Sequence, residues 1–228
     1  MSRLLYGPLR ARRETRSRRA SVALCALMLA ASVWALARWT HGFEVWTHEG
    51  RRALAIEAGS LRAADVALVG SDGLALRPWN GGAGAPARAY LVDWIYLDCP
   101  GVCRALGGAF QQAQQELAAR PEGAGVRLLS VSFDLAHDRP RQLARRAAQL
   151  RADPARWRFA VPATAEGAQE LLRSLGVVVI PDGAGGFVHN GEIHLLDADG
   201  RLRGLYGGAE WPQAVAAAQR LAAAPGSR

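Results

Sequence analysis

The sequence feature that most constrains how this chain can fold is an apolar run near its N-terminus. Residues 20–37 contain no charged side chain, and their length is at the lower end of what spans a bilayer as a helix. Trp34 and Trp39 lie near the far end of the run, as is typical of aromatic residues at a membrane interface. A cleaved signal peptide is the rival interpretation, but the run is long for one and Ala35-Leu36-Ala37 only weakly resembles a cleavage site. We therefore expect a single transmembrane anchor at residues 20–37.

The net charge of the chain belongs mainly to the tail before this run. Seven arginines against one glutamate give residues 1–19 a charge of +6, which leaves +2 of the chain's +8 for the remaining residues. This distribution disfavours a basic nucleic-acid-binding face on the folded part. The positive-inside rule predicts that residues 1–19 are a cytoplasmic tail and that the rest of the chain lies outside.

The rest of the chain predicts a linker and one α/β domain. Residues 38–60 have mixed polarity and are expected to be a juxtamembrane linker, with the domain at residues 61–225. Apolar runs of strand length alternate there with segments of helical periodicity. The expected elements are a hairpin at 66–76, a loop at 80–86, strands at 90–97, 126–133 and 157–161, helices from 101, from 138 and at 165–175, a hairpin of 187–196 with 202–206, and a helix at 209–223. This order is the thioredoxin-like plan with an extra N-terminal β-hairpin, preceded by a single transmembrane helix.

Two cysteines in the exported part carry the main chemical signal. Cys99 and Cys103 form the sequence Cys-Pro-Gly-Val-Cys where a buried strand meets a helix. Backbone N–H groups and the helix dipole favour a thiolate at such a position. A spacing of four residues puts both sulfurs on one side of one turn, so the pair can bind a metal ion or form a disulfide. Cys25 lies in the apolar run and is expected to be a small apolar membrane residue.

The spacing of the pair bears on its chemistry without deciding it. Disulfide oxidoreductases typically have two residues between their cysteines, and this pair has three. Two soft sulfur ligands suit Cu(I), and an imidazole can complete the set, whereas zinc would need further ligands. A structural disulfide or a pair of inert thiols is disfavoured, because closing so short a loop gains little entropy. The cysteine pair is therefore compatible with metal binding and with redox chemistry.

Five histidines are candidates for a third ligand. His189 follows the glycine-rich loop 183–186, which lies beside the cysteine helix in a thioredoxin-like plan, so His189 is the predicted ligand. Asp134 ends the neighbouring strand and is expected to orient a ligand or tune thiol acidity from a second shell. Asp138 is the better candidate to cap the next helix. The other histidines are His41 and His48 near the membrane, His137 in a loop, and His194 among apolar neighbours.

These motifs resemble those of the SCO/SenC family of copper-binding, thioredoxin-like proteins, over about residues 61–221. The family pattern Cys-Pro-x-x-Cys-Pro is matched by residues 99–103, and Asp-x-x-x-Asp-Thr-Pro by residues 134–140. The family's ligand histidine, before a strand that ends in an Asp-x-x-Gly turn, is matched by His189. The departures are Arg104 for proline, Arg139 for threonine and His194 for an aromatic residue, and none removes a ligand.

The resemblance implies copper, as Cu(I) or Cu(II), bound by Cys99, Cys103 and His189. It implies a metallochaperone or thiol reductant that assembles the copper centre of cytochrome c oxidase. The partner would be the copper-bearing subunit of the oxidase or another copper chaperone. The setting would be the bacterial inner membrane, crossed once, with the domain in the periplasm. The alternative is an enzyme, a membrane-tethered thiol–disulfide oxidoreductase or redox-defence protein, with Cys99 and Cys103 as a redox-active pair.

Overall fold

The structure is a computed structural model that describes residues 7–40, 42, 45, 47–79, 87–99 and 101–224. The chain divides into two compact units, Met1–Ala53 and Leu54–Arg228. The predicted loop at residues 80–86, Pro100 and His41 lie outside the described residues.

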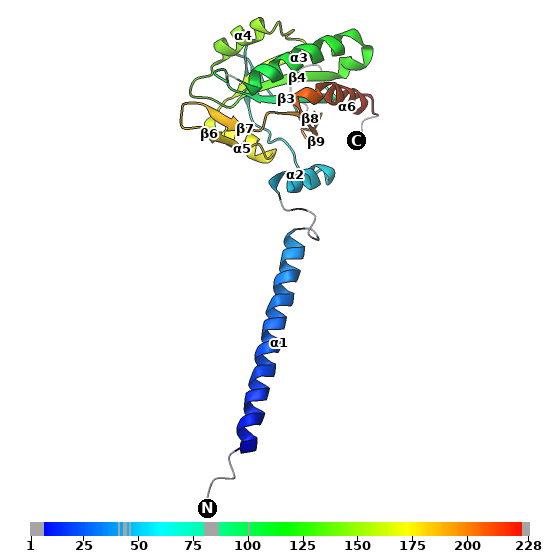
Figure 1. Cartoon of the computed structure of the whole chain (residues 1–228). Coiled ribbons are helices and arrows are strands. Elements are labelled where there is room, and N and C mark those ends of the chain that lie inside the picture. The colour runs from blue at the N-terminus through cyan, green and yellow to red at the C-terminus, as the bar shows by residue number, and fades with distance from the viewer. Residues whose placement is uncertain are drawn as a thin grey trace, which may run out of the picture. The chain divides into compact units, whose positions relative to one another are not determined.

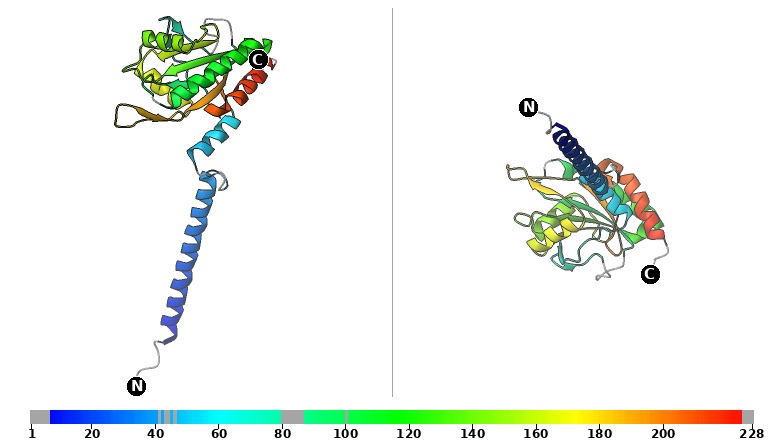
Figure 2. Two further views of the ribbon diagram at one scale, coloured as in Figure 1. Left: turned by 45° about the horizontal axis from the view of Figure 1, so that its top comes forward. Right: turned by 90° about the horizontal axis from the view of Figure 1, so that it is seen from below.

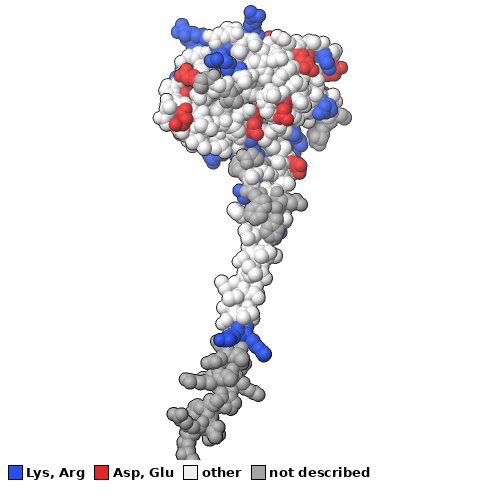
Figure 3. Space-filling model, in the orientation of Figure 1, with Lys and Arg blue, Asp and Glu red and all other residues white. Residues whose placement is uncertain are grey.

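The first unit contains the helix α1 (Gly7–Trp39). Its segment Arg18–Trp39 is long and apolar enough to cross a membrane, and none of its most apolar stretch is buried. Figure 3 shows a long uncharged surface along this helix, and Cys25 is exposed there. A second helix, α2 (His48–Glu57), falls within residues 38–60, where the sequence predicted only a linker.

The second unit is built on a seven-stranded sheet with the strand order β2-β1-β5-β4-β3-β8-β9. The strands are β1 (Leu68–Gly70), β2 (Ala75–Leu76), β3 (Ala89–Ile95), β4 (Val126–Ser132), β5 (Trp157–Pro162), β8 (Glu192–Asp197) and β9 (Leu202–Gly207). The central strands β3, β4 and β5 are parallel, and the other pairings are antiparallel. The thioredoxin-like α/β fold with an additional front hairpin, formed by β1 and β2, is confirmed.

Helices cover both faces of this sheet. The helices are α3 (Val102–Ala119), α4 (Pro140–Gln149), α5 (Ala165–Ser174) and α6 (Trp211–Ala223). Helices α3 and α6 lie side by side on one face (Figure 2), where they share an apolar cluster with Leu143 of α4. Helix α5 packs on the opposite face through Leu171 and Leu175, with the segment that precedes β3.

The apolar stripe of α3 determines where its first turn points. Leu106, Phe110 and Leu117 recur at helical spacing and are at most 1% exposed. Cys103 lies almost one turn before Leu106 on the same stripe, so its side chain also faces the sheet. Complete burial of such a side chain contributes about 2 kcal/mol, so the stripe fixes the rotation of the helix firmly.

One predicted strand is wrong. Residues 187–196 do not form a single strand, because β7 (Phe187–His189) pairs with β6 (Val179–Pro181) in a separate two-stranded ribbon (Figures 1 and 2). The chain turns at Asn190-Gly191, a sequence typical of turns, before β8 enters the main sheet. The Asn190 side chain stabilises the turn by accepting the Val178 N–H at 3.1 Å.

Candidate metal centre

Three side chains from separate segments meet beside the first turn of α3. Cys99 follows β3, Cys103 lies in α3, and His189 ends β7. One ligand atom of each lies within 4.8 Å of the other two, and Cys103 Sγ is 3.7 Å from His189 Nε2. Because metal–sulfur bonds are about 2.3 Å long, donor atoms this close together could hold one ion between them. Two sulfurs and an imidazole are donors typical of a soft-metal site.

The two cysteines differ in exposure and acidity. Burial acts to raise the pKa of Cys99, but hydrogen bonds from Cys103, Gly101 and Tyr96 outweigh it and lower that pKa below its usual value. One of these bonds is donated by the Cys103 N–H to Cys99 Sγ at 3.3 Å. Cys103 is only 6% exposed, and burial, followed by its contact with Cys99, raises its pKa. The more accessible sulfur is therefore the stronger acid and the better nucleophile.

His189 is held as a neutral imidazole. Burial lowers its pKa and outweighs the opposing effect of its hydrogen bond with the Asn190 carbonyl. Nδ1 of His189 lies 3.2 Å from that carbonyl oxygen. A proton on Nδ1 donates to the carbonyl and leaves the Nε2 lone pair facing Cys103, which is the arrangement a metal-binding histidine needs.

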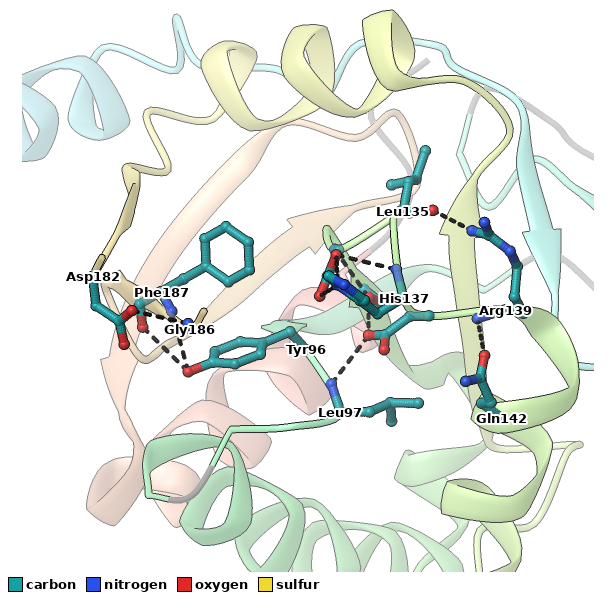
Figure 4. Close-up of polar contacts among 12 residues, drawn as sticks. Tyr96, Leu97, Leu135, His137, Arg139, Gln142, Asp182, Gly186 and Phe187 are labelled. Carbon is teal, nitrogen blue, oxygen red and sulfur yellow. Dashed lines mark hydrogen bonds and ion pairs between the residues drawn. The ribbon is translucent and has the colours of Figure 1, made fainter. Parts of the chain in front are cut away.

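An aromatic cluster attaches the β6–β7 ribbon to the main sheet. The ring of His189 lies 5.2 Å from that of Phe133 and 6.2 Å from that of Tyr96. The Tyr96 hydroxyl donates to the Phe187 carbonyl at 3.3 Å and accepts the Phe187 N–H at 3.4 Å (Figure 4). The sequence did not identify these residues as part of the site. Their only signal was the position of Tyr96 in the run that leads to Cys99.

Asp134 is not brought into contact with the three candidate ligands. Its carboxylate pairs with His137, whose Nδ1 lies 2.9 Å from Oδ2. His137 itself is largely exposed. His194 is completely buried against Trp94, with ring centroids 5.8 Å apart.

The prediction that Asp138 caps α4 is wrong. Its buried carboxylate accepts the Leu97 N–H at 3.0 Å and the Ser132 hydroxyl at 2.5 Å. At the start of α4, the Arg139 N–H donates instead to the Gln142 side chain at 2.7 Å. Asp138 therefore fixes the chain at Leu97, after β3 and two residues before Cys99.

The structure defines a class of protein, a thioredoxin-like domain that carries a Cys-Cys-His group and follows an apolar N-terminal helix in the sequence. The model of the SCO1/SenC family matches residues 83–224, and the chain belongs to this family. A SCO1 protein homolog from Bacillus subtilis (strain 168) is 28% identical over 125 residues. That match covers 54% of this chain and 64% of the homolog.

Solved structures share the fold. ScoI of Bradyrhizobium japonicum, with copper bound, has a TM-score of 0.58 and 19% identity, with coverage of 70% of this chain and 99% of ScoI. BsSco, described as a Sco-family cytochrome c oxidase assembly protein with a disulfide switch, has a TM-score of 0.60 and 20% identity. This second match covers 72% of this chain and 95% of BsSco.

Proposed function

We propose that this protein binds one copper ion through Cys99, Cys103 and His189 and serves in assembly of the copper centre of cytochrome c oxidase. The observation that carries the proposal is the meeting of three soft-metal donors within 4.8 Å, in a family with a copper-bound relative. Bound copper would supply either cargo for transfer or a redox centre. The partner would be the copper-bearing subunit of the oxidase or another copper chaperone.

The membrane setting is part of the proposal. The apolar segment Arg18–Trp39 follows an arginine-rich tail, which supports a single span with the tail in the cytoplasm and the domain in the periplasm of a bacterial cell. A Bacillus anthracis protein of similar fold is a SCO1/SenC family lipoprotein, which supports a membrane setting for this chain as well. On the visible face of the domain, charges of both signs are interspersed (Figure 3).

Copper analysis of the full chain, purified in detergent under reducing conditions, tests the three-ligand site. The wild type is expected to bind about one copper ion per chain, and Cys103→Ser to lose tight binding. His189→Ala should keep the two sulfurs but bind copper more weakly, with a changed absorption spectrum, because the imidazole donor is lost. Matched controls are Cys25→Ser in α1 and His137→Ala, whose imidazole pairs with Asp134. Unchanged stoichiometry, affinity and spectrum in His189→Ala would contradict the ligand set.

A second candidate function is thiol–disulfide exchange with a partner protein. The observation that favours it is the contrast between the accessible, more acidic Cys99 and the buried Cys103. Such a contrast is what a nucleophilic and a resolving cysteine need. Thiol–disulfide exchange predicts catalytic turnover with a dithiol. Stoichiometric delivery of copper alone predicts no such turnover.

A further inference from the structure

Helix α4 carries two exposed arginines that do not stabilise the helix. Arg141 and Arg145 lie four residues apart and therefore project from the same side of α4. Arg141 is in the first turn, where the helix dipole disfavours a positive charge, and like charges four residues apart repel each other. Neither guanidinium forms an ion pair among the residues that the structure describes. Helix stability therefore does not explain these arginines.

Two further exposed arginines lie where α4 and α3 begin. Arg139 directly precedes α4, and Arg104 follows Cys103 in the first turn of α3. The Arg139 guanidinium donates to the Leu135 carbonyl (Figure 4). The SCO/SenC motifs have threonine and proline at these two positions, so both charges are departures of this chain from the motifs. The arginine face is the set of Arg104, Arg139, Arg141 and Arg145.

Contacts at both ends of α4 place this helix beside the segments that carry the cysteines. Just before the helix, Asp138 accepts the Leu97 N–H at 3.0 Å, two residues before Cys99. Just after the helix, the Leu150 carbonyl accepts a hydrogen bond from the Gln111 side chain of α3 at 2.9 Å. The rotation of α4 is fixed as well, because Leu143 is completely buried in the apolar cluster under α3.

Arg146, next to Arg145, shows how close α4 comes to the cysteine pair. It lines a small cavity together with Cys99, Cys103 and the buried acid Asp93 of β3. This cavity has room for about one water molecule. The exposed side of α4 therefore lies about one helix diameter, or about 10 Å, from the pair.

The acids near the arginine face leave positive charge in excess. Helix α4 and the first turn of α3 contain no acidic residue. Asp138 is buried, and Asp134 pairs with His137. Asp98 is exposed beside Cys99 and offsets one of the positive charges. Blue atoms accordingly gather at the upper edge of the domain in Figure 3, where Figure 1 places α4.

We propose that the arginine face is the docking surface for an acidic surface of the protein that approaches Cys99 to take copper or to exchange disulfides. Charge complementarity identifies the partner, because guanidinium groups bind carboxylates through paired hydrogen bonds. Positive charge beside the accessible sulfur speeds the encounter with an acidic partner and slows it with a basic one. The inference rests on the proposed function only in that a partner protein meets this site.

The reaction of Cys99 with charged peptides tests the arginine face. The protein is the reduced, metal-free full chain in a nonionic detergent, carrying Cys25→Ser so that only the pair reacts. The probes are peptides with one cysteine that bears a pyridylthio group, flanked by glutamates, by glutamines or by lysines. The Cys99 thiolate attacks the peptide sulfur, a mixed disulfide forms, and the released pyridinethione is measured by its absorbance.

Two variants remove the same charge from different surfaces. The test variant loses three arginines of the arginine face, by Arg104→Gln, Arg141→Gln and Arg145→Gln. The control variant loses three exposed arginines elsewhere, by Arg120→Gln at the far end of α3, Arg173→Gln in α5 and Arg220→Gln in α6. Arg139 is kept in both variants, because its guanidinium also binds a backbone carbonyl.

The measured quantity is the ratio of the rates with the acidic and the neutral peptide, in which a change in the reactivity of Cys99 itself cancels. At about 0.01 M ionic strength, the wild type and the control variant should react about 10-fold faster with the acidic than with the neutral peptide, and most slowly with the basic one. In the test variant this ratio should fall to about 1. At about 1 M salt it should approach 1 in all three proteins, because the charges are screened.

Two results would overturn the proposal. One is the same ratio of rates in the test and control variants. The other concerns an anionic membrane surface as the occupant, which is examined with the full chain in phosphatidylcholine vesicles with and without phosphatidylglycerol. If phosphatidylglycerol slows the reaction of the wild type with the neutral peptide but not that of the test variant, the arginine face binds lipid rather than an acidic protein.

Copper binding is measured separately in the same proteins. The test variant is expected to bind copper like the wild type, because it keeps Cys99, Cys103 and His189. A wild type that prefers the acidic peptide but binds no copper refutes the copper site and leaves the arginine face supported. A wild type that binds copper but reacts equally with all three peptides at low salt refutes the arginine face alone.

Discussion

Burial of the Asp93 side chain makes the stability of the fold depend on pH. Its folded-state pKa of about 7 lies above the unfolded value of about 4, so the folded state binds the extra proton. The stabilisation from the protonated acid is complete below the unfolded pKa and is lost as pH rises through the folded pKa.

We therefore expect the free energy of unfolding of the wild type to fall, relative to Asp93→Asn, between about pH 4 and pH 8. The expected difference is on the order of 4 kcal/mol, because each pKa unit corresponds to about 1.4 kcal/mol. Denaturant unfolding at a series of pH values measures it. Parallel stability curves for the two proteins would show that the carboxyl is not desolvated.

The residues of the candidate site differed in how visible they were in the sequence. The cysteine pair and His189 stood out by motif and by position relative to predicted elements. Asp93 was hidden, because a single acid within an apolar run does not reveal whether it finds a partner. The pairing of Asp134 with His137 was equally hidden, since the path of a loop decides it.

The β6–β7 ribbon depends on a few contacts with the main sheet. Tyr96→Phe removes both hydrogen bonds between its hydroxyl and Phe187, which contribute about 1 kcal/mol. It also removes a hydrogen bond that lowers the pKa of Cys99. We expect a higher pKa of Cys99, measured by alkylation rate against pH, and faster hydrogen exchange at the Phe187 amide. Tyr206→Phe, on β9, is the matched control and should change neither.

Periodicity predicted the long elements well and the ribbon poorly. Strands such as β3 and β4 are buried along almost their whole length, and α3 has a clear apolar stripe, so their sequences carry the pattern. The strands of the ribbon are three residues each and half-buried or exposed, so burial leaves no pattern there. Helix α2 was missed for a similar reason, within a stretch of mixed polarity.

The whole domain includes the segment in front of β3. Trp79 and Leu68 are buried in the cluster on the face of α5, and the Ala63 N–H donates to the Gly200 carbonyl at 2.7 Å. Gly200 has a φ of 78°, and a Cβ there would lie 3.0 Å from the Trp79 ring. The turn after β8 therefore holds the front segment by close contact.

Gly200→Ala should lower the free energy of unfolding of the full chain by about 2 kcal/mol or more, from backbone strain and the clash with Trp79. Gly73→Ala is the matched control, because its φ of 80° carries the same strain while no atom lies within 4 Å of the added Cβ. Gly73→Ala should lower the free energy of unfolding by about 1 kcal/mol. Equal losses in the two variants would indicate that the front segment does not pack on this turn.

Membrane attachment is tested on the full chain as well. Replacing Leu24 and Leu27 in the apolar segment by arginine adds an insertion cost of about 3 kcal/mol for each residue. We expect the wild type to resist alkaline extraction from membranes and the double variant to become extractable, measured by fractionation. Identical fractionation would contradict a spanning helix.

The position of His189 on the β6–β7 ribbon, apart from the elements that carry the two cysteines, has a kinetic consequence. His189 lies on a ribbon outside the seven-stranded sheet, so its release from a bound ion would leave every strand of that sheet in place. The aromatic contacts of the ribbon would resist such an opening, whereas the two sulfurs would supply the preference for a soft ion. Changes in the ribbon should therefore alter how long the ion stays bound while leaving unchanged which ion is chosen.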